Sequence, residues 1–164
     1  MTFKKTVEAR FQGGLGFTTT TGSGHTIAAD DSDGNTGSRP TELLMAALVA
    51  CTGMDVVSIL AKKRQVVSEY AVHSRSEQRR EYPQVFTTIE VVHDLVGPDL
   101  DVRAVRRAIE LSARKYCPVS AMLSAGETAI HHCYRVRRTG SSPLDESGEV
   151  CVTGPYERPQ VSVG

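Results

Sequence analysis

The feature that most constrains the fold is an uncharged apolar run inside a long helical segment. Twelve residues from Leu43 to Met54 carry no charge and lie between Glu42 and Asp55. Residues 41 to about 64 predict one helix, and its first half, LLMAALVAC, is apolar on every side. That pattern is typical of a helix buried all round. In a chain this small, a single subunit does not easily cover such a helix.

The segments on either side of this helix alternate between strand and helix signals. Before it, a β-meander is predicted from three short segments, 3–12, 17–21 and 25–29, followed by a loop over 30–38. After it, strands are predicted over 66–76, 85–95 and 128–136. A second helix is predicted from Asp99 or Asp101 to about Tyr116, with a short helical restart at Pro118.

Residues 139–164 differ from the rest in composition. Gly, Pro and Ser occupy eleven of these 26 positions, and the apolar periodicity is lost. We therefore expect one α+β domain over 1–138 and a flexible tail over 139–164.

Composition excludes several classes of function. The 164 residues contain 19 Lys+Arg and 19 Asp+Glu, so charge does not favour nucleic acid or an anionic membrane. Aromatic residues make up only 5% and Trp is absent, which disfavours a base-stacking surface. The apolar run is shorter than the roughly 20 residues of a membrane span, and the N-terminal segment resembles no signal peptide. We expect a cytoplasmic protein without nucleic-acid or membrane partners.

Four cysteines are present without any CxxC pair, so free or redox-active thiols are favoured over a disulfide framework. Cys51 lies in the apolar helix, where a small core residue is the simplest interpretation. Cys117 precedes Pro118 and would cap a restarting helix, whose N-terminus lowers a thiol pKa; Arg114 and Lys115 would add to this effect. Two thiols meeting across a helix contact would suit a thiol peroxidase, although spacing alone does not establish that they touch.

Two long motifs now carry a specific resemblance. The segment RPTELLMAALVACTGMDVVSILAKKRQ (39–65) resembles the peroxidatic-cysteine helix of the OsmC/Ohr family, the osmotically induced and organic hydroperoxide resistance proteins. The segment AIELSARKYCPVSAML (108–123) resembles that family's second cysteine motif. The segment CTGMDVVSIL (51–60) is similar to the YhfA-type OsmC-like branch rather than to Ohr proper. The resemblance covers roughly residues 3–137.

The resemblance implies a fold, an assembly and a site. The fold would be α+β, with two antiparallel sheets around two central helices, in an intertwined homodimer. Cys51 matches the peroxidatic cysteine and Cys117 the resolving cysteine. The implied activity is that of a cysteine-based, peroxiredoxin-type oxidoreductase. It would reduce fatty or alkyl hydroperoxides to alcohols through a Cys51 sulfenic acid and a Cys51–Cys117 disulfide. A lipoyl or small-thiol reductant would then recycle it.

Two departures from the Ohr pattern affect the predicted site. The arginine of a Gly-Gly-Arg context is replaced here by Leu15, and the helix-opening glutamate stands one position later, at Glu42. Arg39 and Arg80 are the favoured replacements among four candidate arginines, the others being Arg10 and Arg79. Asp55 follows Cys51 by one helical turn and would either pair with such an arginine or act in helix packing.

Two other classes of function remain open at this stage. The scaffold would serve as an apolar-ligand-binding or redox-sensing module if Cys51 were not activated. A zinc site at Cys117, His131, His132 and Cys133 is disfavoured, because His132 would face away from its two neighbours on the predicted strand. We therefore expect no metal and no cofactor. We expect Cys133 to pack against the core and Cys151 to lie in the tail.

Overall fold

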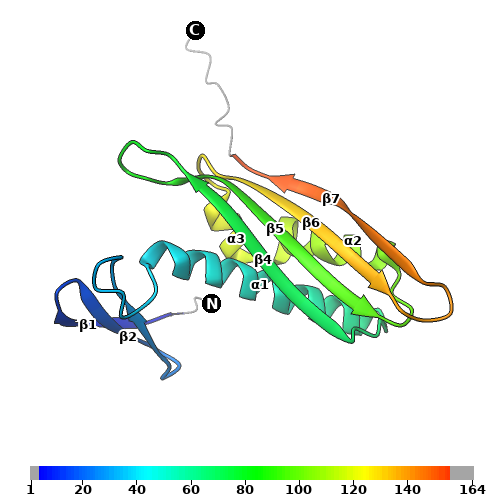
Figure 1. The fold of residues 1–164 in the computed structure, drawn as a ribbon, viewed down its shortest axis with the longest axis horizontal. Helices are drawn as coiled ribbons and strands as arrows, with labels where there is room; N and C mark the ends of the chain where they lie inside the picture. Colours follow the sequence, from blue (N-terminus) through cyan, green and yellow to red (C-terminus); the bar gives the residue numbers. More distant parts are fainter. Residues whose placement is uncertain (1–3, 156–164) are drawn as a thin grey trace, which may run out of the picture. The chain divides into compact units, whose positions relative to one another are not determined.

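The computed structural model describes residues 4–155 (Figure 1). The chain divides into two compact units, an N-terminal unit that ends at Ala46 and a C-terminal unit that begins at Ala47. The long helix α1 (Pro40–Lys62) contains this boundary.

The N-terminal unit contains a three-stranded antiparallel meander in the order β1-β2-β3. The strands are β1 (Val7–Gly13), β2 (Gly16–Thr21) and β3 (Thr26–Ala29). Gly13 and Gly14 have φ angles of 111° and 58°, which glycine adopts without a steric penalty, and they form the turn between β1 and β2. The predicted meander is confirmed in this unit.

Helix α1 begins where the sequence places Pro40 at its first position. The backbone N–H of Arg39 donates a 3.0 Å hydrogen bond to Glu42 Oε2, which satisfies a donor that the helix leaves unpaired. The buried side chains recur every four residues, at Leu48, Thr52, Val56 and Leu60. In a single chain, α1 therefore buries one stripe of its surface rather than every side.

The C-terminal unit contains a four-stranded sheet in the order β4-β5-β6-β7. Its strands are β4 (Glu69–Gln78), β5 (Phe86–Gly97), β6 (Ala129–Arg138) and β7 (Leu144–Thr153). β5 and β6 run parallel, because the chain crosses over between them through helical segments. These are α2 (Val102–Leu111), the π-helical turn η1 (Ser112–Tyr116) and α3 (Pro118–Leu123).

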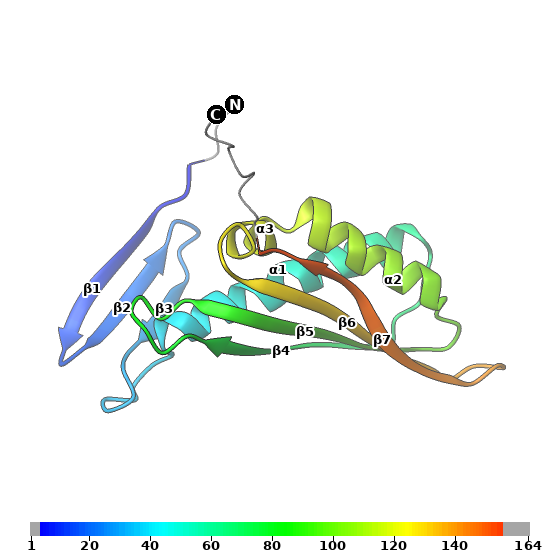
Figure 2. The same cartoon turned by 90° about the horizontal axis from the view of Figure 1, so that it is seen from above.

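The helices of this unit cover one face of its sheet, as Figure 2 shows. The core lies between them and joins α1, β5, α2 and β6. Its fully buried members include Val56, Leu95, Val105, Ile109 and Val136. The spacing of Val105 and Ile109 follows the helical period, which places both on the face of α2 toward the sheet.

The predicted α+β class with two sheets is confirmed, with two corrections. The second sheet is mixed rather than antiparallel, because β5 and β6 pair in parallel. The predicted flexible tail is wrong for Leu144–Thr153, which form β7 and pair with β6. Residues 156–164 of that predicted tail lie outside the described residues.

Within residues 4–155, α1 is the one helix long and apolar enough to cross a membrane by length and composition. Core helices of soluble proteins meet the same criterion.

Candidate functional site

Three side chains of the C-terminal unit converge on one point: Cys51, Asp55 and Cys117. The two sulfur atoms and a carboxylate oxygen of Asp55 all lie within 4.8 Å of one another. Cys51 and Asp55 are one turn apart on α1, so they present their side chains on the same side of the helix. Among the residues that the structure describes, no other three His, Cys, Asp or Glu side chains approach so closely.

The helical backbone is interrupted at Cys117, which is extended and separates η1 from α3. The backbone N–H of Cys117 bonds to the carbonyl of Ser112, 2.9 Å away, which closes the π-helical turn. Cys117 then caps α3, and its Sγ accepts a 3.3 Å hydrogen bond from the N–H of Ser120. Pro118 stands at the first position of α3 and lacks the N–H that the helix would leave unpaired. The predicted cap at Cys117 is therefore present.

The electrostatic prediction for Cys117 is wrong in its direction. Burial is the largest of the causes that raise the pKa of Cys117 to about 12. A hydrogen bond with Cys51 and the negative charge of a Cys51 thiolate also raise it. The N–H groups of Ser120 and Val119 act in the opposite direction but do not outweigh burial. The thiol of Cys117 therefore stays protonated at neutral pH.

The two cations expected near Cys117 have other neighbours. Burial raises the pKa of Cys151, and a hydrogen bond from Arg114 opposes that shift, so the guanidinium lies beside this thiol. The Lys115 ammonium lies 5.3 Å from the centre of the Tyr116 ring. Both cations are exposed to solvent, whereas only 2% of Cys117 is exposed.

A chain of hydroxyl groups holds the third member of the cluster. Ser112 Oγ donates a 2.9 Å hydrogen bond to Asp55 Oδ2. Because Ser112 has one hydroxyl proton, the 3.0 Å contact between Thr52 Oγ1 and Ser112 Oγ is donated by Thr52. Both hydroxyl side chains are fully buried, so this chain ties Asp55 of α1 firmly to the start of η1.

The sequence did not identify Ser112 or Thr52 as site residues. A serine and a threonine within helical segments carry no motif, and their contact joins positions 60 residues apart. One signal was available, since Thr52 follows Cys51 directly and lies four residues from Leu48 on the buried stripe of α1.

The supporting residues proposed from the sequence lie elsewhere or bind other groups. Glu42 and Arg39 belong to the N-terminal unit, where Glu42 caps α1 and Arg39 lies near Asp30. Arg80 is exposed in the loop between β4 and β5. Within residues 47–155, no arginine forms a hydrogen bond or ion pair with the cluster of Cys51, Asp55 and Cys117.

The remaining candidate arginines have partners of their own. Arg10 forms an ion pair of 2.9 Å with Glu8 on β1. Arg79 bonds Glu127 at 3.0 Å and the carbonyl of Pro83 at 2.7 Å. Leu15, at the position of the expected family arginine, is 65% exposed.

The other two thiols, Cys133 and Cys151, do not lie where the sequence predicts them. Cys133 is half-buried on the face of the sheet that the helices leave open, so the expectation that it packs in the core is wrong. Cys151 is not a tail thiol but a buried residue of β7 that pairs with His132. His131 bonds Glu149 at 2.7 Å on the open face, whereas His132 is fully buried, as the alternation of a strand predicts.

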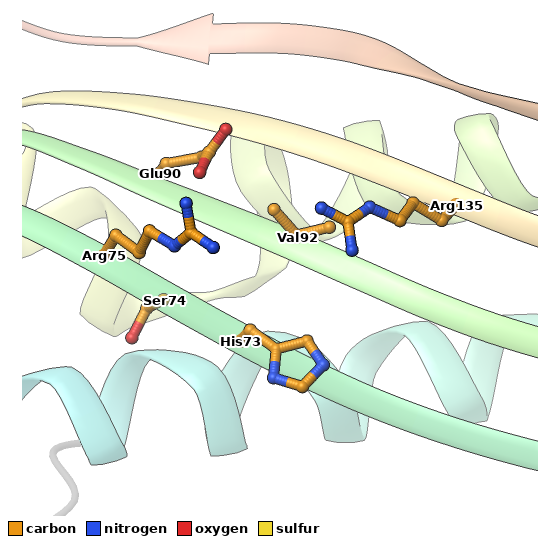
Figure 3. Close-up of a pocket in the computed structure, with 6 residues that line it drawn as sticks. All are labelled: His73, Ser74, Arg75, Glu90, Val92 and Arg135. Atoms are coloured by element: carbon orange, nitrogen blue, oxygen red, sulfur yellow. The ribbon is translucent and has the colours of Figure 1, made fainter.

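The open face of the sheet also carries a small pocket of about 180 Å³ (Figure 3). Its lining consists of His73, Ser74, Arg75, Glu90, Val92 and Arg135. Five of these six side chains are polar or charged, and none is a thiol. The pocket is therefore separate from the cysteine cluster, which lies on the helical side of the sheet.

Comparison with known sequences gives a consistent result. The family model described as "OsmC-like protein" matches residues 32–132. Protein YhfA of Escherichia coli strain K12 is 42% identical over 123 residues, which cover 75% of this chain and 91% of YhfA. The family match includes both motif cysteines, and it ends before β7 begins.

Solved structures share the fold. A hypothetical protein from Aquifex aeolicus is 29% identical with a TM-score of 0.74, covering 84% of this chain and 99% of its own. The organic hydroperoxide resistance protein OhrB of Bacillus subtilis is 20% identical with a TM-score of 0.56, covering 79% and 96%. At that identity, the OhrB likeness speaks for the fold alone. The family match and the identity to YhfA together show that the chain belongs to the OsmC-like protein family.

Proposed function

We propose that this protein is a cytoplasmic thiol peroxidase that reduces organic hydroperoxides to alcohols. The observation that carries the proposal is the meeting of two free thiols, Cys51 and Cys117, within 4.8 Å. They come from separate helical segments, and they are the two residues that match the family's cysteine motifs. Membership in the OsmC-like family supports a redox or peroxide-related role.

The reaction needs two steps that balance. The Cys51 thiolate attacks the terminal peroxide oxygen, the O–O bond breaks, and the leaving alkoxide takes a proton to become the alcohol. Cys51 is then a sulfenic acid. The Cys117 thiol displaces its hydroxyl group as water and forms the disulfide. An external dithiol, of the lipoyl or small-thiol class, reduces this disulfide by thiol–disulfide exchange.

The environments of the two thiols suit different roles. Cys51 is half-buried, so a peroxide reaches it more readily than it reaches Cys117. Cys117 is buried and protonated, which suits a resolving thiol that does not react with peroxide itself and reacts only after Cys51 has been oxidised. Oxidation of Cys51 also removes one cause of the raised pKa of Cys117, since the thiolate charge beside it disappears.

We also propose a homodimer in which α1 contacts its partner. Apolar residues recur along α1 at alternating spacings of three and four, and all are exposed in one chain: Ala47, Ala50, Met54, Val57 and Ala61. Met54 is 74% exposed and Val57 47%. Residues at this spacing form an apolar stripe, here called the seam, of the kind through which two helices pack. The seam includes Ala50, the residue next to Cys51. A second copy would bury the seam and line one side of the cysteine cluster with apolar side chains, which suits a peroxide with an apolar alkyl group.

The dimer also offers a source for the activating cation. No arginine of residues 47–155 bonds the cluster within one chain, and Leu15 stands where Ohr proteins carry theirs. Arg80 lies in an exposed loop, where its guanidinium is free to approach the cluster of a second subunit. We propose Arg80 for this role.

The deciding experiment is a single-turnover oxidation. Reduced protein is mixed anaerobically with one equivalent of cumene hydroperoxide or of hydrogen peroxide, then alkylated and mapped by mass spectrometry. We expect a Cys51–Cys117 disulfide that forms faster with the organic peroxide. Cys51→Ser should prevent it, and Cys117→Ser should accumulate the sulfenic acid. Cys133→Ser is the matched control and should leave the reaction unchanged.

A different result would favour the second candidate, a ligand-binding or redox-sensing module on the same scaffold. The specific observation for that alternative is the lack of an arginine bonded to the cluster. Slow oxidation spread over all four cysteines would reject the peroxidase and leave this alternative.

A further inference from the structure

The cysteine cluster has a composition that its redox role does not require. A dithiol that cycles through a disulfide needs two sulfur atoms, yet Asp55 lies within 4.8 Å of both and is held there by Ser112. Two thiols and a carboxylate are a ligand set that zinc accepts, and sulfur ligands exclude Mg²⁺ and Ca²⁺ as preferred ions. We propose that the reduced cluster binds a soft divalent cation of the Zn²⁺ class, and that oxidation to the disulfide releases it.

The geometry is close to that of a tetrahedral site. Zinc–sulfur bonds of about 2.3 Å and zinc–oxygen bonds of about 2.1 Å place ligand atoms roughly 3.5–3.8 Å apart. The three ligand atoms here lie within 4.8 Å of one another, so a contraction of at most about 1.3 Å completes the set. Three protein ligands leave one coordination position for water, which reaches the cluster from the half-buried Cys51 side.

The surroundings orient the oxygen ligand. Ser112 donates to Oδ2 of Asp55, which leaves Oδ1 free to coordinate a metal. Thr52 in turn donates to Ser112, and both hydroxyls are fully buried. Such partners around a metal ligand fix its direction and strengthen binding.

Metal binding and disulfide formation exclude each other. Binding replaces the two thiol protons by the cation, so affinity should rise with pH. An organic hydroperoxide then takes two electrons from the two thiolates. With two protons from solvent, the products are the disulfide, the alcohol, water and the free cation. Only this release step rests on the proposed peroxidase function; binding by the reduced cluster does not.

The test uses the full-length chain with Cys133 and Cys151 both replaced by serine, which removes the other two thiols as ligands. The reduced protein is titrated with Zn²⁺ against a chromophoric chelator, and with Co²⁺ to observe a sulfur-to-cobalt charge-transfer band. We expect one ion per chain. Cys51→Ser or Cys117→Ser in the same background should weaken binding at least a hundredfold.

The oxygen ligand is tested by two further variants. Asp55→Asn should weaken binding about tenfold or more, and Ser112→Ala should do so through the orientation of Asp55, in the range of roughly ten- to a hundredfold. If Ser112→Ala does not fold, Asp55→Asn decides alone, because Asp55 is only partly buried. Ser58→Ala, an exposed serine on the same helix, should leave affinity unchanged.

Several outcomes would overturn the site. Absence of binding by the reduced protein is one, and binding that survives Cys51→Ser is another. A third is zinc binding that the chain with all four cysteines shows and that Cys133→Ser alone abolishes, which would place the ion near His131 and Glu149 on the open face. Zinc release is then followed during oxidation by cumene hydroperoxide. Disulfide formation without prior zinc binding rejects the metal site and leaves the peroxidase, whereas zinc binding without disulfide formation does the reverse.

Discussion

Ser112 donates a 2.9 Å hydrogen bond to Asp55, although 57 positions separate the two residues. The bond links α1 to the π-helical turn that precedes Cys117, so it holds together the two segments that carry the paired thiols. Single π-helical turns are frequent at functional sites, and this one places Ser112 against Asp55 and Cys117 against Cys51.

Removal of this hydroxyl should destabilise the fold. Ser112→Ala leaves the buried hydroxyl of Thr52 without its acceptor and Asp55 without its donor. We expect a loss of about 1–3 kcal/mol in the free energy of unfolding, measured by urea denaturation. Ser58→Ala, on the exposed side of α1, should change it by less than about 0.5 kcal/mol. Equal losses in both variants would show that the hydrogen-bonded chain contributes nothing.

A buried histidine pair should make stability depend on pH. His93 and His132 are fully buried, and burial lowers their pKa values to about 3 and about 4. His93 Nδ1 lies 2.6 Å from the Tyr70 hydroxyl, which suits a neutral ring that accepts this proton. In the unfolded chain both titrate near 6.5, so below that pH the unfolded state binds more protons than the folded state.

The sign of the effect follows directly. Stability should be constant above about pH 7 and fall as pH drops through 6.5, by roughly 2 kcal/mol per histidine on reaching pH 5. Urea unfolding at a series of pH values measures this slope. His132→Gln should reduce the slope by about half, and His25→Gln, in an exposed turn, should not alter it. A slope that survives in His132→Gln would assign the titration to other groups.

Sequence reasoning succeeded where a segment carries its own signal. The apolar pattern of α1 and the Cys117-Pro118 break both predicted their elements, because helix burial and proline geometry are local properties. The approach of Cys51 to Cys117 followed from the family resemblance rather than from spacing. The part played by Ser112 escaped prediction, since it depends on a contact between distant segments.

β7 was missed for a physical reason. It lies at the edge of a sheet that is covered on one face only, and only Cys151 among its residues is buried, so its composition is correspondingly polar. A bulge opposite His132 and Cys133 also breaks its alternation, which turns both Val150 and Cys151 toward the covered side. A strand with an interrupted period of two and a glycine at Gly148 resembles a linker in sequence.

The apolar seam of α1 predicts how assembly can be disrupted. Met54→Glu places a charge in the middle of the seam, where dimerisation would bury it without a partner. We expect a shift from dimer to monomer, measured by analytical ultracentrifugation at fixed protein concentration. Val66→Glu replaces another exposed apolar residue outside the seam and should leave the dimer intact. A dimer that persists in Met54→Glu would exclude α1 as the contact.

The difference between the two thiols of the cluster predicts a strict order of chemical modification in metal-free protein. Because burial raises the pKa of Cys117 far above that of an ordinary thiol, very few molecules carry a Cys117 thiolate at pH 8. An unfolded cysteine has the pKa of an ordinary thiol, so alkylation of Cys117 should accelerate by more than about tenfold on unfolding. Iodoacetamide labelling followed by mass spectrometry gives the rate for each cysteine. The half-buried Cys133 is the internal reference and should react before Cys117.

Cys51→Ser separates the two causes of this protection. The variant removes the hydrogen bond and the charge by which Cys51 raises the pKa of Cys117, but burial, the larger cause, remains. Labelling of Cys117 should therefore become faster than in the wild type while staying well below the rate in urea. If Cys117 in the wild type reacts before Cys51, the more reactive thiol is the buried one. Cys117 would then have to be the residue that attacks the peroxide, and Cys51 the one that resolves it.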